Sequence, residues 1–229
     1  MPWSQIGAKA GADYQGGGLA VLATPEGARL RCVFQRLEGQ VTSEGLWLAS
    51  TAEDATGERF RVVASAVERT AAEARFLGPL PRTGKVTVAE QLARFIRPGL
   101  TEEYSVSVDG VRQDFVIAER PAGAGDLRVE LVLSGARAEA AAYGAQLSLD
   151  SSGRKLAYSR LRVVDAQGQE LAARLEVTAA TRLAVVVDDA AAAYPVRIDA
   201  FFQDLDWIGL GGIPGANSGV FAAVVDGAR

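Results

Sequence analysis

The sequence predicts an all-β protein: antiparallel β-sandwich layers with hairpin connections and little helix. Three observations lead to this class. Short segments alternate apolar and polar residues, turn-forming residues separate these segments, and no long amphipathic helical stretch occurs. Alternation with a period of two places one face of a strand in the core and the other in solvent. Many short strands of this kind are typical of a sandwich.

The segment 104–117 is the clearest example. Two alternating runs flank Asp109-Gly110, a pair typical of two-residue hairpin loops. The predicted cross-strand pairs are Val108 with Val111, Val106 with Gln113, and Tyr104 with Phe115. The opposite face pairs Ser107 with Arg112 and Ser105 with Asp114, so we expect one mostly apolar face and one wet face.

In the first third of the chain, strands are predicted at 19–22, 28–37, 45–50 and 60–67. Thr24-Pro25-Glu26-Gly27 forms the turn between the first two, with Pro at its second position. A helical turn near 5–9 and a short helix at 68–76 follow from propensity, and 51–58 is predicted to be a loop.

Two interpretations of 87–97 stay open. Thr87 and Glu90 have capping-box spacing, and Val88, Leu92 and Ile96 have helical spacing. As strands, 86–88 and 93–97 flank a tight turn. We favour strands because the surrounding segments are β.

The second half continues the pattern, with strands predicted at 127–133, 146–149, 155–158, 170–177, 182–187 and 194–199. The apolar residues fall on even positions before Ser159-Arg160, at Leu156 and Tyr158, and on odd positions after it, at Leu161 and Val163. Such a change indicates a β-bulge. The Ala-rich stretch 136–142 is predicted to be a loop or one helical turn. Pro195 indicates that the last strand is an edge strand or that it starts there.

Composition narrows the class of partner. The 229 residues suit one large β domain or two small ones, and 48% hydrophobic with 23% charged residues is typical of a globular protein. The net charge of −4 argues against nucleic-acid binding, which favours a basic surface. No membrane span is predicted because no stretch of about 20 apolar residues occurs, and the start of the chain has no secretory signal pattern.

Because the sequence contains no histidine, several kinds of catalytic site and metal site are excluded. Ser-His-Asp and Cys-His catalysis and His-ligated zinc all require that side chain. Cys32 is the single cysteine and shares the parity of Leu30 and Phe34. We therefore expect a buried core thiol; a reactive thiol is the alternative.

One group of acidic residues could be imagined as a glycosidase pair. Glu102, Glu103 and Asp114 lie in or beside the clearest hairpin, and the distance between two such carboxylates would decide retention or inversion. The sequence sets no such distance. We favour the interpretation that these three acids lie on a solvent-exposed face of the sheet.

Other acids lie near the last strand. Asp199, Asp204 and Asp206 form an oxygen-rich cluster of the kind that holds Ca²⁺, but their spacing matches no EF-hand loop. Solvated loop acids are the favoured interpretation. Asp188-Asp189 is interpreted first as a turn signal and second as an ion site.

Aromatic residues raise a carbohydrate-binding alternative. The candidates for a sugar-stacking platform are Trp3, Trp47, Trp207, Tyr143 and Tyr158. Trp47 lies between Leu46 and Leu48, so the pattern does not decide which of these residues face the core. We favour packing of Trp47 in the core. Gly16-Gly17-Gly18 is followed by no Gly-Lys-Ser/Thr and is not a phosphate-binding loop.

A resemblance adds to this interpretation. Arg97-Pro98-Gly99-Leu100, Asp109-Gly110-Val111-Arg112-Gln113-Asp114-Phe115-Val116 and Tyr194-Pro195-Val196-Arg197-Ile198-Asp199 resemble the N-terminal β domain of large secreted bacterial proteins that carry seven-bladed-propeller-type β repeats downstream. The resemblance is most specific over 95–200. Ala200 departs from it, because Pro usually follows the Ile-Asp pair in such proteins. The resemblance implies an extracellular or cell-surface structural domain, without catalytic residues, whose partners are the downstream β repeats of the same polypeptide.

These observations together predict a non-catalytic structural or leading β-sandwich domain, with a carbohydrate- or calcium-binding module as the alternative. No residue receives a catalytic, cofactor-binding or metal-binding role, and no cofactor is expected. The predicted division is an N-terminal β subdomain at 1–84, a C-terminal sandwich at 85–200, and a tail at 201–229 that resembles the start of a truncated repeat. Whether 1–84 and 85–200 share one core stays open.

Overall fold

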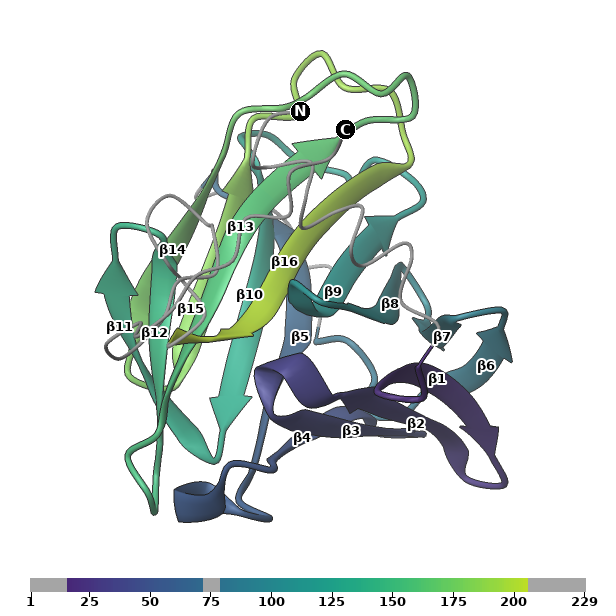
Figure 1. Cartoon of the computed structure of the whole chain (residues 1–229). Coiled ribbons are helices and arrows are strands. Elements are labelled where there is room, and N and C mark those ends of the chain that lie inside the picture. Colours follow the sequence, from purple (N-terminus) through teal and green to yellow (C-terminus); the bar gives the residue numbers. More distant parts are fainter. Residues whose placement is uncertain (1–15, 72–78, 206–229) are drawn as a thin grey trace, which may run out of the picture.

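The structure is a computed structural model, and it describes residues 16–71 and 79–205. These residues form sixteen strands in two antiparallel sheets of eight strands each, which confirms the all-β sandwich. Two three-residue 3-10 turns, at Val33–Gln35 and Glu53–Ala55, are the helical elements of the described residues. The sheets face each other, as Figure 1 shows. Predictions at 5–9, Trp3, Asp206 and Trp207 lie outside the described residues.

Sheet 1 contains the first five strands of the chain and three later ones. Their order is β1 (Leu19–Thr24), β2 (Gly27–Cys32), β3 (Leu37–Thr42), β4 (Gly45–Ser50), β5 (Arg59–Arg69), β10 (Leu127–Ser134), β15 (Arg182–Val187) and β14 (Ala173–Ala179).

Sheet 2 contains the remaining strands. Their order is β11 (Ala136–Ala141), β12 (Gly144–Leu149), β13 (Lys155–Val164), β16 (Val196–Asp204), β9 (Gly110–Ile117), β8 (Leu100–Ser107), β7 (Leu92–Arg97) and β6 (Lys85–Ala89).

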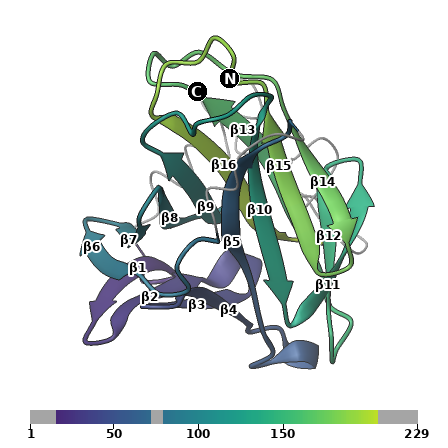
Figure 2. The same ribbon diagram turned by 180° about the vertical axis from the view of Figure 1, so that it is seen from behind.

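Strand β5 joins the two halves of sheet 1. It pairs with β4 only at Phe60 and Arg59, and then runs on beside β10 along its length. Figure 2 shows β5 leaving the small lobe of β1 to β4 and rising next to β10. One edge of β5 therefore loses its partner strand just after Phe60.

The two predicted ranges 1–84 and 85–200 meet in one sheet, because β5 of the first range pairs with β10 of the second. Their buried apolar residues belong to one contiguous core. Phe60 of sheet 1 contacts Phe202 of sheet 2 edge-on, with ring centroids 5.8 Å apart. Strand β16 continues to Asp204, past the predicted start of the tail at 201, and 206–229 lies outside the described residues.

The hairpin at 104–117 forms, but its predicted register is wrong by one loop position. Ser107 pairs with Gly110 and Val106 with Val111, so Val108-Asp109 is the loop. Gly110 is needed inside the ladder, where it has a φ of 141° and where a Cβ atom would lie 2.3 Å from the Phe202 carbonyl oxygen. The predicted faces are unchanged, because the pairing slides by two residues in total.

Three predictions of local structure are wrong. The stretch 136–142 is largely the strand β11, in which Ala136 and Ala138 are buried and pair with β12. The helix predicted at 68–76 does not begin at 68, because β5 continues to Arg69, and 72–76 lies outside the described residues. The strand predicted at 28–37 ends at Cys32, and Arg36 has a left-handed φ of 52° after the 3-10 turn.

Other predictions are confirmed. Residues 87–97 form β6 and β7 around Glu90 and Gln91, as favoured. The bulge at Ser159-Arg160 is present, since the pairing of β13 with β16 shifts there and Arg160 has a φ of 57°.

Pro195 marks a strand start and not an edge. It follows a cis peptide bond with Tyr194, and β16 begins at Val196. Strand β16 pairs with β13 on one side and β9 on the other, so it is central in sheet 2. An unpaired edge near 194–199 is therefore excluded. The sheets end instead at β1, β14, β11 and β6.

Candidate functional site

The most buried polar network surrounds Glu102, which points from β8 into the core between the sheets. Its Oε1 accepts hydrogen bonds from Arg97 Nη2 at 2.5 Å and from the Ala64 amide at 3.3 Å. Its Oε2 accepts from the Tyr104 hydroxyl at 2.9 Å and from Gln113 Nε2 at 2.8 Å. This carboxylate is therefore saturated with donors.

The Glu102 network replaces the missing strand beside β5. Where β5 has left β4, Arg97 Nη1 donates to the Ala64 carbonyl and Gln113 Nε2 donates to the Val62 carbonyl. With the bond from the Ala64 amide to Glu102, buried side chains satisfy backbone groups that a neighbouring strand would otherwise pair. The network is thus a structural consequence of the split between β4 and β5.

Burial raises the pKa of Glu102 above the ordinary glutamate value, and Arg97, Tyr104 and Gln113 oppose that rise. Burial and the nearby Glu102 carboxylate also raise the pKa of Tyr104. Arg97 was not among the residues predicted from the sequence to belong to a site. The signal was present, because Arg97 shares the strand parity of the buried Ala93 and Phe95.

Glu103 and Asp114 lie on the opposite face of sheet 2 from Glu102, so the three acids do not form one site. Glu103 and Asp114 are direct cross-strand partners. Arg197 Nη1 lies between them, 2.7 Å from Glu103 Oε2 and 2.6 Å from Asp114 Oδ2. Both acids are buried rather than solvated, because arginine side chains cover them.

Asp199 completes this arrangement from the neighbouring strand β16. Arg112 donates to Asp114 Oδ1 at 2.6 Å and forms an ion pair with Asp199 Oδ2 at 2.7 Å. Burial raises the pKa of Asp114 to about 6, and the charge of Asp199 adds to this rise, while Arg112 and Arg197 oppose it.

The raised pKa of Asp114 has a definite effect on stability. Between the ordinary aspartate value of 3.8 and about 6, the folded protein holds a proton that the unfolded chain releases. The free energy of unfolding of the wild-type protein, measured relative to that of Asp114→Asn, should therefore fall by up to about 3 kcal/mol as pH rises through that window. Carboxyl ¹³C titration measures the pKa of Asp114, and urea unfolding at several pH values measures the free energy of unfolding. An Asp114 carboxyl that titrates near 3.8 would contradict this expectation.

Asp204 belongs to a second internal network. It accepts from Arg154 Nη2 at 2.6 Å and from Arg36 Nε at 2.8 Å, while Gln35 Oε1 accepts from its amide at 2.7 Å. Asp199 and Asp204 lie on opposite faces of β16, one outside sheet 2 and one inside the sandwich. Solvated loop acids were therefore the wrong interpretation, and these two residues cannot share one calcium ion.

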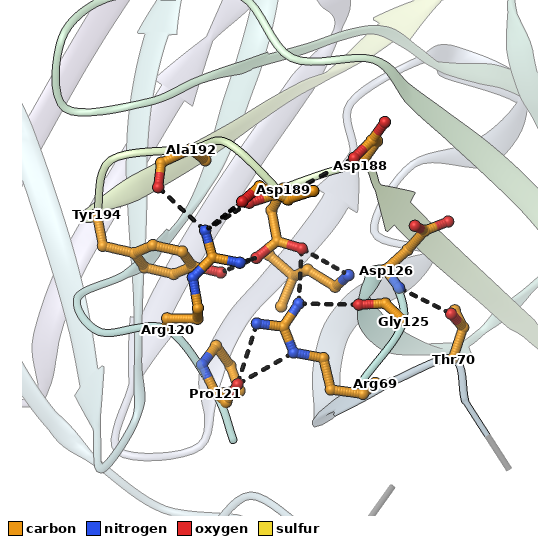
Figure 3. A network of polar contacts seen from close by, with 12 residues as sticks. Arg69, Thr70, Arg120, Pro121, Gly125, Asp126, Asp188, Asp189, Ala192 and Tyr194 are labelled. Atoms are coloured by element: carbon orange, nitrogen blue, oxygen red, sulfur yellow. Dashed lines mark hydrogen bonds and ion pairs between the residues drawn. The ribbon is translucent and has the colours of Figure 1, made fainter. Parts of the chain in front are cut away.

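Asp189 is the centre of a third network, shown in Figure 3. Its Oδ1 accepts from Arg69 Nη1 at 2.6 Å and from the Leu127 amide at 3.2 Å. Its Oδ2 accepts from the Tyr194 hydroxyl at 2.7 Å and from Arg120 Nη1 at 3.0 Å.

The Asp189 network ties loops to the core. Arg69 also donates to the Pro121 and Gly125 carbonyls, and Arg120 donates to the carbonyls of Asp189, Ala190 and Ala192. The turn interpretation of Asp188-Asp189 holds for Asp188, which is exposed and accepts from the Ala190 amide. It holds for Asp189 as well, because the Ala192 amide donates to the Asp189 carbonyl at 3.0 Å. The sequence did not predict that the Asp189 side chain is buried, where it joins β5, β10 and two loops.

Trp47 lies on the outer face of sheet 1, so the predicted core packing is wrong. Strict alternation in β4 buries Leu46 and Leu48 and turns Trp47 outward. The guanidinium groups of Arg59 and Arg61 lie 5.0 and 5.1 Å from its ring. Trp47 lines a shallow depression of about 430 Å³ together with Gln40 and other polar residues.

The other members of the proposed aromatic platform do not join Trp47. Tyr158 is buried in the core, where its hydroxyl donates to Gln113 Oε1 at 3.1 Å. Tyr143 is half-buried in the turn between β11 and β12.

Cys32 is buried, as predicted, and burial raises the pKa of its thiol to about 12. A thiol of this kind stays protonated at neutral pH and is unreactive. Within 16–71 and 79–205, no group of three or more Cys, Asp or Glu side chains is arranged to hold a metal ion.

Comparisons with known protein families, curated proteins and solved structures found no match. In the part of the chain that the structure describes, no helix has the length and apolar character needed to cross a membrane.

Proposed function

We propose that this chain is a non-catalytic structural domain that leads a larger extracellular bacterial protein. One observation carries the proposal. Each buried carboxylate in the described residues already accepts hydrogen bonds or ion pairs from arginine or from backbone amides. Groups engaged in this way stabilise a scaffold and are not poised for proton transfer to a substrate.

The ion pairs support this role because they join segments far apart in the sequence. Arg69 and Asp189 are separated by 120 positions, and Arg36 and Asp204 by 168. Such links hold loops and sheets in one arrangement. A domain that begins a repeat protein needs this rigidity in order to present a fixed edge to the next unit.

Strand β14 is the edge that we propose for contact with downstream β repeats of the same polypeptide. Among the described residues, it forms a ladder only with β15. Leu175 and Val177 on this strand are only half-buried. An edge strand with an unpaired side can accept a further strand by backbone hydrogen bonding.

Hydrogen exchange tests this proposal. We expect amides of β14 to exchange more slowly in a polypeptide extended by the adjoining repeat region than in the isolated chain. Amides of β10, which pairs on both sides, serve as the internal control and should not change. Equal exchange of β14 in both samples would refute the proposed contact.

A carbohydrate-binding module is the second candidate, and the outward-facing Trp47 favours it. An outward-facing, half-buried aromatic ring beside polar side chains such as Gln40 suits stacking against a sugar. Glycan binding that is lost in Trp47→Ala but kept in Tyr143→Ala would favour this candidate over the structural one.

A further inference from the structure

A second depression, of about 490 Å³, opens on the outer face of sheet 1 where β5 has left β4. It lies over the gap that the Glu102 network fills from the inside. The polar side chains that line it are Glu44, Arg61, Ser65, Arg82, Arg97 and Ser134.

Positive charge dominates this depression. Three arginines line it, and Glu44 is the one carboxylate among the lining residues. Arg97 also pairs with Glu102 behind it, whereas Arg82 is exposed and has no ion pair among the described residues. Among the residues that the structure describes, Arg61 donates only to a neutral acceptor, the Glu44 carbonyl, at 2.5 Å.

Two of these guanidinium groups have an unsatisfied donor. The Nε atoms of Arg61 and Arg97 are buried and have no hydrogen-bond partner in the described part of the chain. The side chain of Arg97 is only 2% exposed. A buried donor without an acceptor lowers the free energy of unfolding by about 1–3 kcal/mol. Native proteins therefore seldom contain buried donors that have no hydrogen-bond partner.

The arginines also affect each other. Burial lowers the pKa of Arg61, and the charges of Tyr104, Glu102 and Glu44 oppose this effect. The nearby charge of Arg97 is the smallest of these contributions and lowers the pKa further. An anion between the two would offset this repulsion and would supply acceptors. Oxyanions match guanidinium groups in both charge and planar hydrogen-bond geometry.

We propose that this depression binds a small oxyanion, a carboxylate or phosphate group, through Arg61 and Arg82, with Arg97 adding charge beneath them. The site is distinct from the depression at Trp47 and does not depend on the structural role proposed above.

Titration of the full chain with inorganic phosphate, acetate and glucuronate, followed by calorimetry and NMR, tests this site. We expect at least one probe to bind, and Arg61→Gln and Arg82→Gln each to weaken it by about tenfold, the loss of one charge-assisted hydrogen bond. Glu44→Gln should strengthen binding, because it removes the lining carboxylate. The three probes separate a phosphate from a simple carboxylate and from an acidic sugar.

Arg59→Gln is the matched control. Arg59 also contacts Trp47 from β5, at a similar distance to Arg61, but it lines the other depression. Its replacement should leave binding unchanged. An equal loss in Arg59→Gln would show general attraction to the basic surface and overturn the proposal. The absence of binding for all three probes at about 10 mM, ten times a weak Kd of 1 mM, would also overturn it.

Discussion

Replacing Arg97 with alanine is expected to lower the free energy of unfolding by about 3–5 kcal/mol. The substitution leaves the Glu102 carboxylate buried without its charged partner, and the side chain of Glu102 is 0% exposed. It also removes the donor to the Ala64 carbonyl, where β5 has no neighbouring strand. Urea unfolding measures the loss.

A second substitution separates charge from packing. Glu102→Gln in the Arg97→Ala background removes the unpaired charge, so the double variant should be more stable than Arg97→Ala alone. Arg94→Ala is the control on the same strand. Arg94 pairs with Glu103 at 2.7 Å, but its side chain is 38% exposed, so its removal should cost less than about 1 kcal/mol. Similar losses for Arg94→Ala and Arg97→Ala would contradict the central role of the buried network.

Replacing Asp189 with alanine is expected to cost a similar amount, about 3–5 kcal/mol. Arg69, whose side chain is 2% exposed, would keep its charge in the core with only carbonyl acceptors. The Tyr194 hydroxyl and the Leu127 amide would also lose their acceptor. Thermal and urea unfolding should both show the loss.

Asp188→Ala is the matched control for this experiment. Asp188 is the exposed neighbour of Asp189 and accepts one hydrogen bond, 3.3 Å long, from the Ala190 amide. Its loss should cost less than about 1 kcal/mol. If Asp189→Ala unfolds as wild type does, Asp189 does not hold the loops as the geometry indicates.

Acid should weaken the Asp189 network. Burial alone would raise the pKa of Asp189, but hydrogen bonds from Arg69 and Tyr194 outweigh it and lower the pKa below the ordinary value. The stability that this carboxylate contributes is therefore present at neutral pH and is lost as pH falls through the lowered pKa. Asp114 acts in the opposite direction, because its pKa is raised.

Much of the fold was predictable from local pattern. Alternation placed Leu183, Val185 and Val187 inward in β15, and a change of parity at Ser159-Arg160 located the bulge. Both signals are local, because the side chains of a strand alternate between its two faces wherever the strand lies. The Ala-rich strand β11 was not predicted, because alanine has weak strand propensity. Its pairing with β12 determines its conformation.

The candidate sites were less predictable. A charged residue at an apolar parity position, as with Arg97 beside Phe95, indicates a buried charge but not its partner. Arg69 and Asp189 illustrate the difficulty, since 120 positions separate them and only the packed sheets bring them together.

Alternation and turn residues alone were enough to specify strands, hairpins and the class of the protein, since these depend on neighbours in the chain. Three features required the folded molecule: the pairing of β5 with β10, the outward position of Trp47, and the arginine partners of buried acids such as Asp189 and Asp204. The physical reason is that a buried charge is stabilised by whichever opposite charge the packing of distant strands brings within hydrogen-bonding distance.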